Sequence, residues 1–184
     1  WNKKINLIAR KDVENFEVNH LLHSLSILKF IEFKKDTKIL DLGTGGGLPG
    51  IPLSIVFPDS KFKLIDRKNK KINVLNKIIS ELGINNASAQ TIDIIDSNHN
   101  YDFIVNRAVS SADNLIKFCK GKINYKGENK IKNGIICLKG GNLNSELKNI
   151  DKFQIVELKT FFSEQFFETK KILYIPNPYS HMDS

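Results

Sequence analysis

The stretch Asp41-Leu-Gly-Thr-Gly-Gly-Gly-Leu-Pro-Gly50 decides the fold, because it joins a short apolar run to a dense set of glycines. Residues 38–42 (Lys-Ile-Leu-Asp-Leu) are predicted to form a buried strand that ends at the first glycine. The glycines permit positive φ angles and let the main chain come close to a ligand. Residues 50–57 are predicted to form a short helix that stops at Pro58. The segment therefore has the order strand, glycine loop, helix.

Strands and helices alternate through the rest of the chain. Further strands are predicted at residues 61–66, 87–92, 101–106 and 134–139, and helices at residues 70–82, 111–120 and 144–150. An amphipathic helix is predicted over residues 14–32, and two β-rich runs, residues 153–162 and 166–175, are predicted to pair as a hairpin. This alternation predicts one α/β domain. It has a mostly parallel, Rossmann-like sheet with helices on both faces, an N-terminal helix and a C-terminal antiparallel hairpin.

The composition is that of a globular protein. The 184 residues fit one domain, with 41% hydrophobic and 26% charged residues. No apolar run approaches the roughly 20 residues that span a bilayer, and the first residues lack the apolar core of a signal peptide. The two cysteines, Cys119 and Cys137, are far apart and match no metal-ligand spacing. We therefore expect a cytoplasmic protein that binds neither a metal nor a membrane.

The chain is basic, with a net charge of +8 at pH 7 and an isoelectric point near 9.4. Such a charge suits a polyanionic partner, because the neutralisation of phosphates drives affinity for nucleic acids. Lys, Asn and Ile are all abundant, however, as an AT-rich genome would produce without selection for binding. Charge alone therefore leaves nucleic-acid binding open.

The glycine loop by itself leaves two classes of cofactor open. Residues 45–50 match the pattern GxGxxG, and Asp66 ends the next strand, where a carboxylate accepts hydrogen bonds from the ribose of NAD. Against a dinucleotide, Pro49 lacks the N–H that a pyrophosphate-binding helix should supply. Asp41 suits the ammonium or backbone network of an aminoacyl cofactor such as S-adenosylmethionine. A glycine loop with a purely structural role is the third interpretation.

Segments spread over nearly the whole chain resemble the bacterial 16S rRNA guanine-N7 methyltransferase family, also called glucose-inhibited division protein B. The matching segments are Trp1-Asn-Lys-Lys-Ile-Asn-Leu7, His20-Leu-Leu-His-Ser-Leu25, residues 41–53, Asp66 with Lys70-Lys71, Asn106-Arg-Ala-Val109, Leu138-Lys-Gly-Gly141 and Glu168-Thr-Lys-Lys-Ile172. The resemblance implies a class I S-adenosylmethionine-dependent methyltransferase. Residues 1–184 would form a single domain, with an N-terminal helical part (1–36) and a Rossmann-like core (37–184). A further helix of the family would precede Trp1.

The resemblance also implies an activity, which is methylation of guanine N7 in 16S rRNA or in the small ribosomal subunit by a monomeric enzyme. N7 carries a lone pair at neutral pH and can attack a sulfonium methyl without a general base, so no catalytic residue is assigned. Cys137 in mid-strand argues against methylation of a pyrimidine carbon, which needs a cysteine nucleophile in the cleft. The alternative is a class I methyltransferase that acts on a small molecule or a protein.

By the same resemblance, the cofactor-binding residues are Asp41, Gly43, Thr44, Gly45, Gly47, Leu48, Pro49, Asp66, Ile92, Asp93 and Arg107. The loop from Gly43 would enclose the methionine half of the cofactor, and Asp66 would hold its ribose. Asp93 is expected to face the adenine, with Asp96 as the alternative. Arg107 follows the fourth strand and could pair with a carboxylate or a phosphate.

The substrate-binding residues implied by the resemblance are Lys139, Lys70, Lys71, His20 and Asn6. Lys139 ends the fifth strand and is expected to contact RNA phosphate or guanine O6. The lysine pair opens a helix near the cofactor and is expected to meet the RNA backbone, while the histidine and the asparagine match family positions on N-terminal helices. His23 stands where many members carry Asp, so it is given no role.

Overall fold

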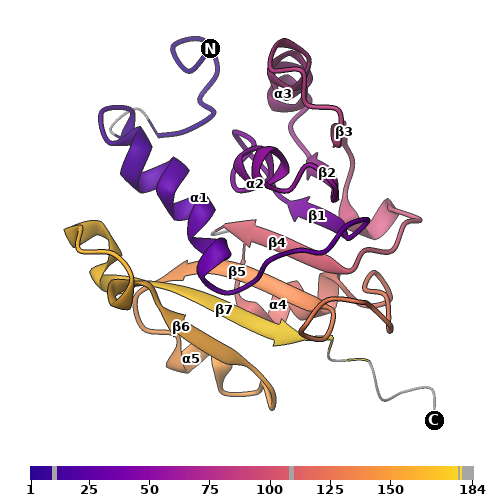
Figure 1. The fold of residues 1–184 in the computed structure, drawn as a ribbon, viewed down its shortest axis with the longest axis vertical. Coiled ribbons are helices and arrows are strands. Elements are labelled where there is room, and N and C mark those ends of the chain that lie inside the picture. Colours follow the sequence, from indigo (N-terminus) through magenta and orange to yellow (C-terminus); the bar gives the residue numbers. More distant parts are fainter. Residues whose placement is uncertain (10–11, 108–109, 178, 180–184) are drawn as a thin grey trace.

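A single mixed sheet organises the described part of the chain, residues 1–9, 12–107, 110–177 and 179 of the computed structural model, and its strand order is β3-β2-β1-β4-β5-β7-β6 (Figure 1). The strands are β1 (Lys38–Leu42), β2 (Lys61–Asp66), β3 (Ala87–Thr91), β4 (Phe103–Arg107), β5 (Gly134–Gly140), β6 (Gln154–Glu157) and β7 (Lys170–Pro176). Strands β1 to β5 are parallel, and β7 runs antiparallel to β5 and β6. The order reverses between β1 and β4, so the loop after β1 lies at the switch point where such sheets bind ligands.

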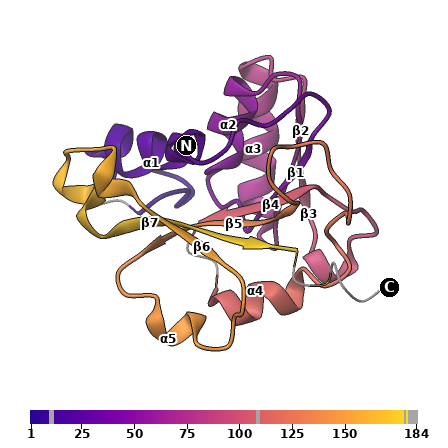
Figure 2. The same ribbon diagram turned by 60° about the horizontal axis from the view of Figure 1, so that its bottom comes forward.

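The helices lie on the two faces of this sheet. One face carries α2 (Gly50–Val56), α3 (Asn69–Glu81) and the N-terminal helix, and the other carries α4 (Ala112–Phe118) and α5 (Asn144–Leu147), as Figure 2 shows. The N-terminal helix is irregular, because a π-helical part (Glu17–Leu22) leads into α1 (His23–Leu25) and then into a 3-10 turn (Ser26–Lys29). No helix in the described ranges is both long and apolar enough to cross a membrane.

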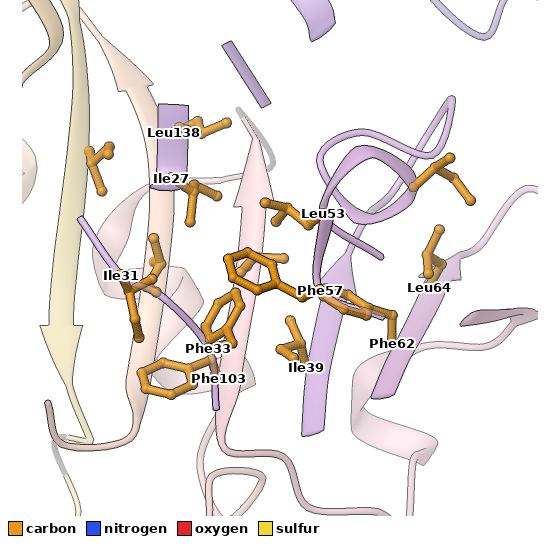
Figure 3. Close-up of a cluster of buried hydrophobic side chains, with 14 of the residues drawn as sticks. Ile27, Ile31, Phe33, Ile39, Leu53, Phe57, Phe62, Leu64, Phe103 and Leu138 are labelled. Atoms are coloured by element: carbon orange, nitrogen blue, oxygen red, sulfur yellow. The ribbon is translucent and has the colours of Figure 1, made fainter. Parts of the chain in front are cut away.

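The larger hydrophobic core lies beneath the N-terminal helix, α2 and α3. Figure 3 shows Phe33, Phe57 and Phe103 gathered there, and the ring centre of Phe33 lies 5.1 Å from that of Phe57 and 5.3 Å from that of Phe103. Ile27 is fully buried in the same core, so the N-terminal helix packs directly on the sheet. A second core, beneath α4 and α5, takes the alternate side chains of β1, as a two-residue strand repeat requires.

The predicted fold class is confirmed, including the C-terminal antiparallel hairpin. Three predicted elements differ most from the structure in extent. The N-terminal helix spans residues 17–29 and not 14–32, and the hydroxyls of Ser24 and Ser26 donate to main-chain oxygens within it. The two β-rich runs form strands only at 154–157 and 170–176. A 3-10 turn takes the place of strand at 165–169, because it lets Phe167 bury its ring against Phe162, with 4.3 Å between the ring centres.

Candidate active site

The Asp41 side chain binds two residues of the glycine loop, Thr44 and Gly50. One carboxylate oxygen, Oδ2, accepts hydrogen bonds from the Thr44 hydroxyl at 2.6 Å and from the Gly50 N–H at 2.8 Å. The other oxygen, Oδ1, is buried without a partner among the described atoms. Burial raises the pKa of the Asp41 carboxyl to about 6, against the lowering effect of these two hydrogen bonds and of the Arg107 charge. Asp41 therefore binds the loop's own atoms.

The second half of the loop is packed into the protein. Gly47, Leu48 and Pro49 are buried, and a Cβ on Gly47 would lie 2.6 Å from Ile51 Cγ1. A Cβ on Gly46 would lie 3.0 Å from the carbonyl oxygen of Leu7, so the N-terminal segment covers the loop closely. Gly47, Leu48 and Pro49 were predicted as cofactor ligands, and they lie outside the described linings of the cavities considered below.

A cavity of about 320 Å³ lies beyond the carboxyl ends of β1 to β3. Its described lining residues are Leu42, Gly43, Ile65, Asp66, Arg67, Lys68, Ile92, Asp93, Ile94, Ser110 and Phe118. Asp66 ends β2, and its two oxygens accept hydrogen bonds from the N–H groups of Gly45 at 3.0 Å and of Lys68 at 2.9 Å. We call this space the nucleoside cavity, because it combines a carboxylate at a strand end with apolar walls.

The structure separates the two acids that follow β3. Asp93 lines the nucleoside cavity, while Asp96 is exposed and stands outside its described lining. The Asp93 carboxylate pairs with Arg67 at 2.5 Å and also accepts a hydrogen bond from the N–H of Ile95 at 3.2 Å. Of the two candidates, Asp93 is therefore placed to face a ligand.

A second cavity, of about 610 Å³, lies between the N-terminal helix and the ends of β4 and β5. Its described lining residues are Asp12, Asn19, His23, Arg107, Ser110, Leu138, Lys139, Gly140, Glu146, Phe166 and Lys170. We call it the substrate cavity, because Lys139, which was predicted to bind the substrate, is among its lining residues. Ser110 lines both cavities, so the two spaces adjoin along one wall.

Arg107 was predicted to bind the cofactor, and the structure places it on the substrate cavity. Its guanidinium donates from Nη1 to the main-chain oxygen of Asn19 at 3.3 Å and so joins β4 to the N-terminal helix. Burial lowers the pKa of Arg107, while the charges of Asp41 and Asp12 raise it. Because the ordinary pKa of arginine is so high, the side chain stays charged at pH 7.

Lys139 lines the substrate cavity, and its ammonium group also has internal partners. The Nζ atom is 2.8 Å from Glu146 Oε2 and donates to the Ser110 carbonyl oxygen at 2.6 Å, and only 9% of the side chain is exposed. An internal carboxylate neutralises this charge, and the contact of Lys139 with RNA phosphate or guanine O6 stays a prediction. Lys170 is the other lysine on the substrate cavity, with Nζ 4.7 Å from the ring centre of Phe166.

The remaining predicted substrate residues are scattered. His20 is buried and stacked on Phe16 with 5.9 Å between ring centres. Its Nε2 is 3.7 Å from Asp12 Oδ2, and burial and the Arg107 charge lower the pKa of His20 while the Asp12 charge raises it. Asn6 is exposed in a segment of turns, so its predicted place on a helix is wrong.

The two lysines at the start of α3 differ in what they reach. Lys70 is exposed. Lys71 is half-buried, and its Nζ lies 3.6 Å from the position of a Cβ on Gly45, so its ammonium reaches the glycine loop. The structure thus brings Lys71 to the rim of the loop and leaves Lys70 on the outer surface of the helix.

A family profile described as rRNA small subunit methyltransferase G matches residues 1–172. A ribosomal RNA small subunit methyltransferase G from Christiangramia forsetii is 46% identical over 179 residues, which cover 97% of this chain and 85% of the relative. The corresponding protein from Bacteroides thetaiotaomicron is also 46% identical, over 95% of this chain and 85% of the relative. The chain belongs to the rRNA small subunit methyltransferase G family. The resemblance noted in the sequence is thereby confirmed.

Solved structures agree with the fold of this methyltransferase G family member. An S-adenosylmethionine-dependent O-methyltransferase from Thermotoga maritima superposes with a TM-score of 0.62 at 13% identity, over 83% of this chain and 64% of that one. A ribosomal protein L11 methylase from Lactobacillus delbrueckii has a TM-score of 0.61 at 17% identity, over 84% of this chain and 76% of that one. At these identities the likeness concerns the fold, which is that of class I methyltransferases.

Several residues of the methyltransferase G site were missed from the sequence. His23 is 5% exposed, lines the substrate cavity and meets the rings of Phe166 and Phe167 edge-on. Phe118 of α4 lines the nucleoside cavity. Leu42 and Ile65 could have been found, because each stands at the end of a predicted strand. The aromatic residues had no such signal, since tertiary packing alone brings them to the cavities.

Proposed function

We propose that this chain transfers a methyl group from S-adenosylmethionine to N7 of a guanine in 16S rRNA. The observation that carries the proposal is the pair of adjoining cavities: one suits a nucleoside, the other is lined by the cations Arg107, Lys139 and Lys170, and Ser110 lines both. Membership of a family named for methylation of small-subunit rRNA supports the same substrate class.

The residues of the nucleoside cavity fit the adenosine part of the cofactor. Asp66 stands at a strand end, where a carboxylate can accept hydrogen bonds from both ribose hydroxyls, and Asp93 offers an acceptor near the adenine position. Ile92 and Phe118 supply apolar walls for a planar base. Gly43 has a φ of 67° and lines the cavity, so its main chain can approach a ligand without a side chain in between.

A dinucleotide fits less well. The pyrophosphate of NAD needs unpaired N–H groups at the start of the helix after the glycine loop. In this chain the first N–H of α2, from Gly50, already donates to Asp41, and Pro49 before it has no N–H. The helix start is therefore committed to an internal carboxylate.

For methyl transfer to guanine N7, the main task of the protein is to place the two reactants next to each other. S-adenosylmethionine, when bound, would supply a methyl group on a sulfonium sulfur. Guanine N7 would take this methyl with its own lone pair, and the electrons of the broken carbon–sulfur bond would stay on the sulfur. The side chains Arg107 and Lys170 on the substrate cavity are suited to hold RNA oxygens. The methylated guanine becomes cationic, and the Asp12 carboxylate on this cavity can stabilise that charge. We also propose that the enzyme acts as a monomer in the cytoplasm, with residues 1–36 and 37–184 as one unit.

Calorimetric titration of the protein with S-adenosylmethionine and, separately, with NAD tests the cofactor. Heat with the first and none with the second is expected, and the reverse would refute the proposal. The target is tested with small ribosomal subunits from a strain that lacks the corresponding gene. After incubation with protein and cofactor, nuclease digestion and mass spectrometry should detect 7-methylguanosine in the rRNA. Methylation of another atom, or of protein in the particle, would reject the guanine assignment.

A further inference from the structure

One ion pair holds the main chain at Ser110, the residue that lines both cavities. Lys139, in β5, and Glu146, in α5, pair at 2.8 Å with side chains only 9% and 18% exposed. The two atoms of the ion pair also bind main-chain groups: Lys139 Nζ donates to the Ser110 carbonyl oxygen at 2.6 Å, and Glu146 Oε2 accepts from the Ala112 N–H at 2.9 Å. The pair therefore holds the main chain on both sides of Ser111.

Helix α4 depends on this carboxylate. It begins at Ala112, and the residue before it, Ser111, makes no side-chain cap hydrogen bond. The first N–H groups of a helix need acceptors and favour a negative charge nearby. Glu146 provides both from another element, so α5 fixes where α4 starts.

The position of Ser110 follows from the same pair. Its carbonyl oxygen accepts a hydrogen bond from the Lys139 ammonium group. Without Glu146, this largely buried charge would have no counter-ion. Ser110 lines the nucleoside cavity and the substrate cavity, so any shift of this residue changes the distance between what the two cavities hold. Methyl transfer is sensitive to such shifts, because misplacement by 1 Å can cost about 100-fold in rate.

We propose that Glu146 is a positioning residue for methyl transfer, which acts through Lys139 and through the main chain of Ser110 and Ala112. The inference rests on the proposed function, since it concerns the step between the two cavities. Glu146 itself need not touch cofactor or RNA. Its removal is expected to lower kcat more than it raises either KM.

The test compares Glu146→Ala, Glu146→Gln and Glu157→Ala with the unchanged chain. Glu157→Ala is the matched control, because it breaks the ion pair between Glu157 and Lys171 (2.5 Å) on the β6–β7 edge, outside the described lining of both cavities. Glu146→Gln keeps an oxygen that can accept from Ala112 and Lys139. Steady-state methylation of small subunits, binding of S-adenosylhomocysteine and hydrogen exchange of peptides from residue 110 to 118 are measured, at a temperature where circular dichroism shows all variants folded.

The expected result is a kcat at least about tenfold lower in Glu146→Ala, with KM values within about threefold, and substantial recovery in Glu146→Gln. Amide hydrogen exchange near Ala112 should become faster in Glu146→Ala, and not in Glu146→Gln or Glu157→Ala. This readout does not depend on which substrate the enzyme methylates. If the unchanged chain is active and Glu146→Ala behaves like Glu157→Ala in rate or in exchange, the positioning role is overturned. If the unchanged chain methylates no rRNA, the proposed function fails and the positioning role fails with it.

Discussion

The carboxylate of Asp41 at the end of β1 accepts a hydrogen bond from the Gly50 N–H at the start of α2, with 2.8 Å between the two atoms. This contact spans the whole glycine loop and fixes its ends relative to each other. Asp41 is fully buried, and burial raises its pKa to about 6. The loop is therefore held by a carboxyl that titrates close to neutral pH.

The stability of the protein should depend on pH through Asp41. Because the folded-state pKa is raised, this group stabilises the fold fully below the unfolded pKa of 3.8, and the contribution is lost as the pH rises through about 6. In Asp41→Asn that loss is absent. Between pH 4 and pH 7, the free energy of unfolding of the unchanged chain should fall by roughly 2–3 kcal/mol relative to the variant. Urea unfolding of both proteins at each pH measures this difference. A constant difference would contradict the prediction.

The substitution Gly50→Ala tests how tightly the loop is packed. An added Cβ would lie 2.6 Å from Asp41 Oδ2 and 2.9 Å from Leu64 Cγ, both in the buried interior. Overpacking of this kind costs about 1–3 kcal/mol, and the thermal midpoint should fall by several degrees. Gly83→Ala is the steric control, because no atom lies within 4 Å of its added Cβ although its φ is +63°. Equal losses in the two variants would show that sterics at Gly50 do not matter.

His23 should make the protein sensitive to acid. Burial lowers its pKa to about 3, helped by the charges of Arg107 and Lys170 and by His20. The unfolded chain binds a proton below pH 6.5 and the folded chain does not, so stability is lost as the pH falls from 6.5 towards 3. The variant His23→Phe keeps a ring beside Phe166 and lacks this loss. Between pH 7 and pH 4.5, the unchanged chain should lose roughly 2–3 kcal/mol more than the variant. Parallel acid-unfolding curves would refute the assignment.

Asp93 and Asp96 give a matched pair for the adenine position. Asp93 lines the nucleoside cavity and Asp96 is exposed, although only three residues separate them. Asp93→Asn should weaken S-adenosylmethionine binding by about tenfold or more, because it removes a charged acceptor at the cavity. Asp96→Asn should leave the dissociation constant unchanged. Calorimetry on both variants decides between them, and the opposite ranking would move the adenine contact to Asp96.

The sequence predicts strand ends better than it predicts the aromatic and charged residues around them. The bounds of β1 and β2 agree with prediction because each is an apolar run stopped by glycine or by charge, and Asp66 follows from the end of β2. Asp93 follows in the same way from the end of β3. Phe118 and Phe166 come from α4 and from the turn before β7. They reach the cavities only through tertiary packing, which local periodicity does not encode.

For Lys139, the sequence predicts the position of the residue but not the partner of its charge. Its position at the end of β5 is as predicted, yet its charge is used internally. Whether a strand-end lysine faces solvent or an internal carboxylate depends on where α5 docks. The four residues of α5 are too few for their own pattern to place them.

Lys170, and not Lys139, is therefore expected to carry the electrostatic contact with RNA. Its ammonium lies on the substrate cavity over the Phe166 ring. Lys170→Gln should weaken binding of small-subunit rRNA and reduce the slope of log affinity against log salt by about one. Lys61→Gln is the control, since Lys61 starts β2, at the end of the strand opposite to the cavities, and its side chain is 65% exposed beside Asp36. Filter binding across a salt series measures both slopes. An unchanged slope in Lys170→Gln, or an equal drop in Lys61→Gln, would mean that the cavity lysine makes no specific phosphate contact.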